Sequence, residues 1–252
     1  MKKIHFAGPL IDQKDINIVQ RSVQDGFYDN YKRYINIFSK NIKSYFKIKY
    51  ALPTFTCTHA MHLAAMSLDL KRNDEIICPD MSWVATAHAL SHHHLKIKFC
   101  DIDLNTLCIS TASLKKNITK KTKAIMVVHL HGLMCDMDKI RKIAKKYKIS
   151  LIEDAAQTHG SLYKKKSPGY FSDVATFSFY PTKNLGAVGE GGAIITNNKK
   201  INEKTKRMRS WSHKKHDFYE IGFNYRMTEF SAISLLAKLK YLSSDIKRRI
   251  SI

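Results

Sequence analysis

The chain has 252 residues, 44% of them hydrophobic, so it can bury a sizeable core as one large domain or as a domain with a smaller appendage. No apolar run is long enough to span a bilayer, and residues 1–15 lack the continuous apolar core of a signal peptide. The five cysteines are scattered and never spaced as CxxC, which favours reduced, buried thiols over a disulfide framework or a zinc site. The composition predicts a soluble, cytoplasmic protein with no membrane partner.

The formal net charge of +22 would attract nucleic acid, anionic lipid or a phosphorylated small molecule, and charge alone does not choose among them. Lysine outnumbers arginine, and isoleucine and asparagine are plentiful. This composition is typical of the surfaces of proteins encoded by an AT-rich genome. No zinc-finger, helix-turn-helix or RNP-like signature is present. A solvated lysine surface is therefore favoured over a dedicated site for nucleic acid.

The elements alternate along the chain. Two amphipathic stretches at about 13–25 and 31–46 come first. Short β-like runs then follow at 47–53, 74–79, 97–103, 123–132 and 149–154. Segments with helical spacing lie between them, near 58–69, 82–91 and 136–148. This rhythm predicts an α/β fold, with a mostly parallel sheet covered by helices on both faces.

The pattern changes in the last third. Closely spaced strands are predicted at 173–180 and 192–197, joined by a loop that carries Lys183, and one long helix is predicted from Met227 toward the end. No internal repeat, low-complexity tract or flexible linker marks a domain boundary.

Lys183 and Asp154 carry the strongest chemical signal. Ligands of such sheets bind beyond the carboxyl ends of the strands, where both residues are expected. A lysine that is partly desolvated there can lose its proton and attack a carbonyl. An aspartate at the same edge can keep a heterocyclic nitrogen protonated. The pair suggests pyridoxal 5′-phosphate, which needs a Schiff-base lysine and an acid facing its ring nitrogen.

Five segments occur in an order and spacing that resemble one family: TFTCTHAMHLA, DEIICPDMSWVATA, IEDAAQTHGS, FSFYPTKNLGAVGEGGA and GFNYRMTE. The chain resembles, over about residues 5–240, the DegT/DnrJ/EryC1/StrS family of pyridoxal-phosphate sugar aminotransferases of fold type I. The resemblance implies a cofactor-binding large domain at 1–240, including an N-terminal helical segment at 1–48. Residues 241–252 would then be the end of the long helix and the start of a C-terminal subdomain.

The resemblance also implies roles for single residues. Lys183 would form the Schiff base with the cofactor, Asp154 would hold the pyridine nitrogen, and Gln157 would contact the ring hydroxyl. A relative that acts as a sugar dehydratase would carry histidine in place of Lys183. The structural alternatives are a surface lysine in a turn and an aspartate that merely caps a helix.

The cofactor phosphate requires backbone donors and hydroxyls at the start of a helix. Cys57 and Thr58 open the helix-like run at 58–69 and fit that need, with Ser178 as a second hydroxyl. The family commonly has glycine where this chain has Cys57. Trp83 would stack on the pyridine face, and its alternative is a half-buried core residue.

Asn224 resembles the family residue that reaches the cofactor phosphate of the partner subunit, which implies a homodimer with shared sites. The alternative is that the segment around Asn224 merely caps the long helix. No metal site is predicted, because the adjacent His92, His93 and His94 point in different directions on any regular element. A metal at His129 and His131 is likewise not expected.

The reaction implied by the resemblance is transamination, with glutamate as amino donor and a keto-deoxyhexose on a nucleoside diphosphate as acceptor, for a surface polysaccharide or lipopolysaccharide. Family members continue into a C-terminal subdomain beyond the long helix, so a truncated chain, or a second polypeptide that supplies the remainder, is expected here. Two alternatives stay open: an inactive or partner-dependent relative that binds cofactor without turnover, and a basic nucleic-acid-binding protein.

Overall fold

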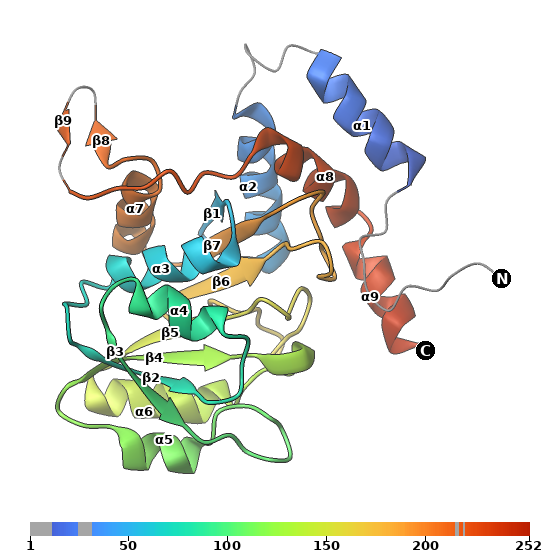
Figure 1. Ribbon diagram of the computed structural model, residues 1–252. Coiled ribbons are helices and arrows are strands. Elements are labelled where there is room, and N and C mark those ends of the chain that lie inside the picture. The colour runs from blue at the N-terminus through green and yellow to red at the C-terminus, as the bar shows by residue number, and fades with distance from the viewer. Residues whose placement is uncertain (1–11, 25–31, 215–216, 219) are drawn as a thin grey trace.

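The computed structural model describes residues 12–24, 32–214, 217–218 and 220–252, and a seven-stranded sheet lies at its centre (Figure 1). In spatial order the strands are β1 (Tyr50–Thr54), β7 (Gly192–Thr196), β6 (Val174–Ser178), β5 (Ser150–Asp154), β4 (Thr122–Val128), β2 (Glu75–Pro79) and β3 (Lys96–Cys100). Neighbours from β6 to β3 are parallel, whereas β7 is antiparallel to both β1 and β6. The prediction of a mostly parallel α/β sheet is confirmed.

Helices cover both faces of this sheet. Adjacent strand residues point to opposite faces, so Ile76 packs into one core cluster and Ile77 into another. The first cluster lies under α3 (Cys57–Ser67), α4 (Ala85–Ser91) and α7 (Lys199–Met208). The second lies under α5 (Thr111–Asn117) and α6 (Met137–Tyr147) on the other face (Figure 1).

A third cluster joins the N-terminal and C-terminal helices over β6 and β7. Helix α2 (Arg33–Phe46) contributes Phe38, Ile42 and Phe46, and α8 (Glu229–Leu239) contributes Leu235 and Leu239. Helix α1 (Gln13–Gln24) packs against α8, although the two are far apart in sequence (Figure 1). The predicted N-terminal helices are thus present, while residues 25 and 31 at their predicted limits lie outside the described residues.

The prediction of one long helix from Met227 is wrong. Helix α8 ends at Leu239, and α9 (Leu242–Ile250) starts after a turn at Lys240 and Tyr241. The turn keeps Leu242 in the third cluster with an exposed fraction of 1%. It also lays Ile246 against Gly160, where an added Cβ would come within 2.3 Å of the isoleucine Cδ1. Packing, rather than helical spacing, sets the break.

Helices α5 and α7 were not predicted, although both carry capping signals. The Ser110 hydroxyl accepts a hydrogen bond from the backbone N–H of Ser113, and the Asn198 side chain accepts from Lys200 and Ile201. A two-stranded ribbon, β8 (His213–Lys214) and β9 (Asp217–Phe218), was also missed. Among the described residues, no helix is long and apolar enough to cross a membrane.

Phe177 links the core to the site, because it lies on β6 one residue before Ser178 and its ring stacks on Phe46 with centroids 4.3 Å apart. We predict that Phe177→Ala lowers the free energy of unfolding by about 3–5 kcal/mol through the cavity it leaves. Phe99→Ala, at a ring 55% exposed on the edge strand β3, is the matched control. Its expected cost is below about 1 kcal/mol. Urea unfolding measures both, and equal losses would contradict the prediction.

Candidate functional site: a cleft at the carboxyl ends of the strands

A cleft of about 580 Å³ lies beyond the carboxyl ends of β4, β5 and β6. This is the edge where open α/β sheets bind ligands. The cleft brings together residues that are up to 134 positions apart, from Thr56 to Glu190. Seven of the eight predicted site residues line it: Cys57, Thr58, Trp83, Asp154, Gln157, Ser178 and Lys183.

Asp154 is the last residue of β5, and only 5% of it is exposed. One carboxylate oxygen accepts a hydrogen bond from the Thr86 hydroxyl at 2.8 Å, and the other accepts from the Ala156 N–H at 3.1 Å. Burial raises the pKa of Asp154, although these hydrogen bonds and the charge of Lys183 oppose that rise. No helix begins at Asp154, so the helix-cap alternative does not hold.

A buried pair that the sequence analysis did not identify lies beside Asp154. His129, which lines the cleft, and Glu153 are both fully buried, with Nε2 and Oε2 2.6 Å apart. The His129 Nδ1 atom accepts the Cys135 N–H, so Nε2 carries the proton and donates it to Glu153. The second Glu153 oxygen accepts from the Gly169 N–H at 2.8 Å. In the sequence, His129 was considered only as a metal ligand, inside the predicted strand at 123–132, so no local signal pointed to its pairing with Glu153.

The loop after β6 places Lys183 at the rim of the cleft. The Phe179 N–H donates to Gly191 O, and the Ala187 N–H donates back to Phe179 O, which closes the loop. Gly186 allows this, because an added Cβ would lie 2.4 Å from Pro181 O. The Lys183 side chain is half-buried rather than on an open turn.

Helix α3 begins at the cleft with Cys57 and Thr58. Thr56 caps the helix, and its hydroxyl accepts the His59 N–H at 3.1 Å. The backbone N–H groups of the first turn have no partner within the helix and form a place for an anion. Gly192 of β7 lets the helix start approach the sheet, since an added Cβ would lie 2.3 Å from the Thr56 carbonyl carbon. Burial raises the pKa of the Cys57 thiol well above its ordinary value, so the thiol is neutral and adds no negative charge.

Of the predicted site residues Trp83 and Asn224, the first lines the cleft and the second does not. Trp83 lines the cleft and is 75% exposed, so it is not a core residue. Asn224 is exposed and does not line the cleft; it pairs with Ser210 in an isolated β-bridge. Asn224 does not cap α8 either, because the Thr228 hydroxyl takes that place by accepting the Ser231 N–H.

His92, His93 and His94 lie away from the cleft and do not converge. The His93 Nε2 atom is 2.7 Å from Leu70 O, and the His92 ring contacts His62. In the described part of the chain, no group of three histidine, cysteine or acidic side chains is placed to hold a metal ion. The five cysteines are all free and buried.

The donor set of the cleft fits a small heterocyclic cofactor that carries a phosphate and an aldehyde. A helix start supplies N–H groups for an anion, a buried carboxylate can face a protonated ring nitrogen, and an amine stands at the rim. The exposed indole of Trp83 offers an aromatic surface for a ring. Fold and cleft together define an α/β protein of the pyridoxal-phosphate-dependent class.

The family model described as the DegT/DnrJ/EryC1/StrS aminotransferase family matches residues 9–252, and the chain belongs to this family. Its members are pyridoxal-phosphate-dependent sugar aminotransferases. The chain is 33% identical to GDP-perosamine synthase of Escherichia coli O157:H7, over 99% of this chain and 69% of that protein. It is 38% identical to the dTDP-3-amino-3,6-dideoxy-alpha-D-galactopyranose transaminase of Aneurinibacillus thermoaerophilus, over 96% and 69%. The chain thus spans about two thirds of the length of these relatives.

Solved structures agree with this assignment. 3-Amino-5-hydroxybenzoic acid synthase superposes with a TM-score of 0.91 at 29% identity, covering 97% of this chain and 65% of that one. The NtdA protein of Bacillus subtilis, with bound cofactor PMP, superposes with a TM-score of 0.86 at 29% identity, covering 97% and 58%.

The burial of Asp154 makes a pH-dependent prediction for the cofactor-free protein. An aspartate in an unfolded chain has a pKa of about 3.9, and the pKa of Asp154 in the folded protein is higher. Between the two values the folded state keeps a proton that the unfolded state has lost, so this residue's contribution to stability falls as pH rises. Asp154→Asn removes that fall and can keep the hydrogen bonds to Thr86 and Ala156. We therefore expect the stability of the variant, relative to the unchanged protein, to increase from pH 4 to pH 7.

Urea unfolding at several pH values measures this difference. Asp69→Asn applies the same substitution to a side chain that is 84% exposed and lacks the burial penalty, so it is the control. A stability difference for Asp154→Asn that stays constant from pH 4 to pH 7 would show that burial does not penalise this carboxylate.

Proposed function

We propose that this chain transfers an amino group from glutamate to a keto-deoxyhexose carried on a nucleoside diphosphate, for a surface polysaccharide or lipopolysaccharide, in the cytoplasm. The observation that carries the proposal is the meeting of Lys183, Asp154 and the start of α3 in one cleft. The relatives named as GDP-perosamine synthase and as a dTDP-aminodideoxygalactose transaminase support the substrate class.

Pyridoxal phosphate, when bound, supplies an aldehyde that takes up amines and a protonated ring that withdraws electrons from the neighbouring carbon. Lys183 Nζ would form the covalent bond that holds it. With an amino acid bound in its place, the free amine of Lys183 would be positioned to accept a proton from the α-carbon of that amino acid and to return a proton to the carbon on the other side of the nitrogen. The half-buried position of Lys183 at the rim suits both tasks.

The phosphate would be bound by the backbone N–H groups of Cys57 and Thr58, the Thr58 hydroxyl and Ser178. The Ser178 Oγ atom accepts the Tyr180 N–H at 3.3 Å, which leaves its own proton free to donate to a phosphate oxygen. Because the Cys57 thiol is neutral, it does not repel the phosphate.

The ring would lie between Trp83 and the floor of the cleft. Asp154 would accept the hydrogen bond of the ring nitrogen, with the Thr86 hydroxyl and the Ala156 N–H fixing its carboxylate. Gln157 Oε1 already accepts the His131 N–H at 2.6 Å, so its amide NH₂ is oriented to donate to the ring hydroxyl. The Glu153 carboxylate would hold the ring of His129, which lines the cleft together with Asp154.

Asn224 supports the proposal of a homodimer. It is exposed, stands outside the cleft of its own chain, and belongs to a segment stiffened by ring stacking of Tyr225 on His59 and Phe223. In a symmetric dimer it would reach the phosphate of the partner's cofactor.

We predict that the purified chain, mixed with pyridoxal phosphate, develops a visible absorbance band that borohydride removes as it fixes the cofactor to the protein. Lys183→Ala is expected to lose both the band and the fixation, because the amine that bonds the cofactor is gone. Lys199→Ala, at a side chain 75% exposed on α7, is the control and should retain both. Fixation at a lysine other than Lys183, located by peptide mass spectrometry, would refute the assignment.

Turnover is tested by following 2-oxoglutarate formation from glutamate with a nucleoside-diphosphate 4-keto-6-deoxyhexose. Asp154→Asn is expected to lower kcat by about 100-fold or more, because a neutral amide does not hold the ring nitrogen protonated. The cofactor should still be bound, since the phosphate contacts and Lys183 are unchanged. A variant with unchanged kcat would remove Asp154 from the mechanism.

A further inference from the structure

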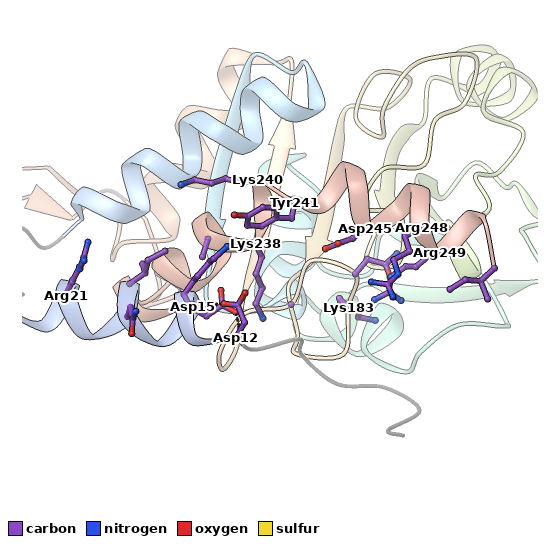
Figure 2. Close-up of a pocket in the computed structure, with 17 residues that line it drawn as sticks. Asp12, Asp15, Arg21, Lys183, Lys238, Lys240, Tyr241, Asp245, Arg248 and Arg249 are labelled. Carbon is purple, nitrogen blue, oxygen red and sulfur yellow. Dashed lines mark hydrogen bonds between the residues drawn. The ribbon is translucent and has the colours of Figure 1, made fainter. Parts of the chain in front are cut away.

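Two features of the chain lie next to the cofactor cleft. One is a basic cavity of about 820 Å³, which is lined by residues of α1, α8, α9 and the Lys183 loop (Figure 2). Because Lys183 also lines the cofactor cleft, this cavity adjoins the site already described. The other is a pair of thiols, Cys108 and Cys135, which lines neither space and takes no part in the proposed reaction.

Cys108 and Cys135 meet in the core cluster under α5 and α6. Each sulfur contacts backbone beside the other cysteine. The Cys108 Sγ atom is 3.6 Å from Leu133 O, and the Ile109 N–H donates to the Cys135 sulfur. The two thiols also share a hydrogen bond. Sulfur atoms this close need only a small movement to reach the geometry of a disulfide.

The pair lies just below the surface. Cys108 is 4% exposed and Cys135 is 1% exposed. The chain enters Cys108 from an exposed turn at 103–106, and Leu133, two residues before Cys135, is half-exposed. A local opening of such a turn admits a molecule of the size of hydrogen peroxide. The site therefore selects a small oxidant over a large one.

Among the five thiols, only Cys108 has a lowered pKa. The hydrogen bond with Cys135 is the largest cause, and it lowers the pKa of Cys108 to about 6 although burial opposes the fall. The same hydrogen bond, together with burial, raises the pKa of Cys135 well above its ordinary value. Burial raises the pKa of the other three thiols. Cys108 is therefore the thiolate that reacts first at neutral pH.

Two contacts join Cys135 to the wall of the cofactor cleft. The Cys135 N–H donates to His129 Nδ1 at 3.2 Å, and the Cys135 Sγ atom is 3.2 Å from Val128 O. Val128 and His129 both line the cleft. The single proton of the Cys135 thiol has two acceptors within reach, Val128 O and the Cys108 sulfur. A disulfide removes that proton, and any shift of Cys135 is passed to His129.

We propose that Cys108 and Cys135 form a reversible disulfide in the presence of a hydroperoxide, and that this bond weakens cofactor binding through Val128 and His129. The Cys108 thiolate attacks one peroxide oxygen, the O–O bond breaks, and hydroxide leaves Cys108 as a sulfenic acid. The Cys135 sulfur then attacks the Cys108 sulfur. The S–S bond forms, the S–O bond breaks, and water leaves with the Cys135 proton.

The balance of this reaction is simple. Two thiols lose two electrons and two hydrogens in all, and the peroxide is reduced to two molecules of water. A dithiol such as dithiothreitol reverses the oxidation by thiol exchange. The effect on the cofactor rests on the proposed function, whereas formation of the disulfide does not.

The first experiment treats the cofactor-free protein with hydrogen peroxide, removes the peroxide, and blocks the remaining thiols under denaturing conditions. Trypsin cleaves at lysines between the two cysteines, such as Lys115 and Lys123, so the disulfide joins two separate peptides. We expect mass spectrometry to find Cys108 linked to Cys135, and dithiothreitol to release the link. Methionine sulfoxide is not reversed by dithiothreitol and is thereby distinguished. Absence of the linked peptide, or equal amounts of other cysteine pairs, would overturn the proposal.

Single variants test the order of the steps. Cys135→Ser should stop at the sulfenic acid of Cys108, which dimedone traps, and Cys108→Ser should leave Cys135 unmodified. Cys78→Ser is the matched control. Cys78 is 1% exposed and lies on β2 next to β3, which carries Cys100, but the two side chains belong to clusters on opposite faces of the sheet. The control should form the Cys108–Cys135 link as the unchanged protein does, and its loss there would contradict the assignment.

The second experiment titrates pyridoxal phosphate into oxidised and reduced protein and follows the visible band. The oxidised protein should have a Kd higher by about threefold or more, as expected when one hydrogen bond at the cleft wall is lost. Dithiothreitol, removed before the cofactor is added, should restore the reduced value, and Cys108→Ser should show no effect of peroxide. An unchanged Kd in the oxidised protein would overturn the link to the cleft. A band missing from both states would instead count against the proposed function, because the linked peptide is detected without cofactor.

Discussion

The burial of one carboxylate organises the site. Asp154 ends a central strand at 5% exposure, and a charge in that position is costly unless its oxygens are bound. The Thr86 hydroxyl and the Ala156 N–H bind them, and the pair of His129 and Glu153 lies alongside. Three segments that are far apart in the sequence therefore have to meet at this point. The protonated ring nitrogen of a bound cofactor would place a positive charge next to the Asp154 carboxylate. The surrounding residues supply that positive charge only in part.

Close packing of backbone provides the rest of the geometry. Gly192 lets the start of α3 lie against β7, and Gly186 folds the Lys183 loop back on Pro181. These two approaches bring the N–H groups at the start of α3 and the side chain of Lys183 to one cleft. The turn between α8 and α9 then carries Arg248 and Arg249 to the far side of Lys183. Lys183 thus lines both the proposed cofactor cleft and a second, basic cavity.

Most of the sheet could be predicted because strand and helix leave different periods in the sequence. Each of the seven strands was expected within a few residues, and seven of eight site residues share one cleft. The break at Lys240 was not predictable, because both α8 and α9 have helical sequences and only the packing of Leu242 and Ile246 separates them. The link between His129 and Glu153 joins residues 24 positions apart and leaves no local pattern.

The sequence by itself determined the alternation of strands and helices and, through ordered motifs, the family, and it supplied the proposed roles of Lys183 and Asp154. These depend on local periodicity and on residue type, which the chain carries without folding. Only the tertiary structure decided that Trp83 is exposed in the cleft, that Asn224 lies outside it, and that a basic cavity meets the cleft at Lys183. Exposure and shared walls depend on how distant segments pack, and no spacing along the chain records that.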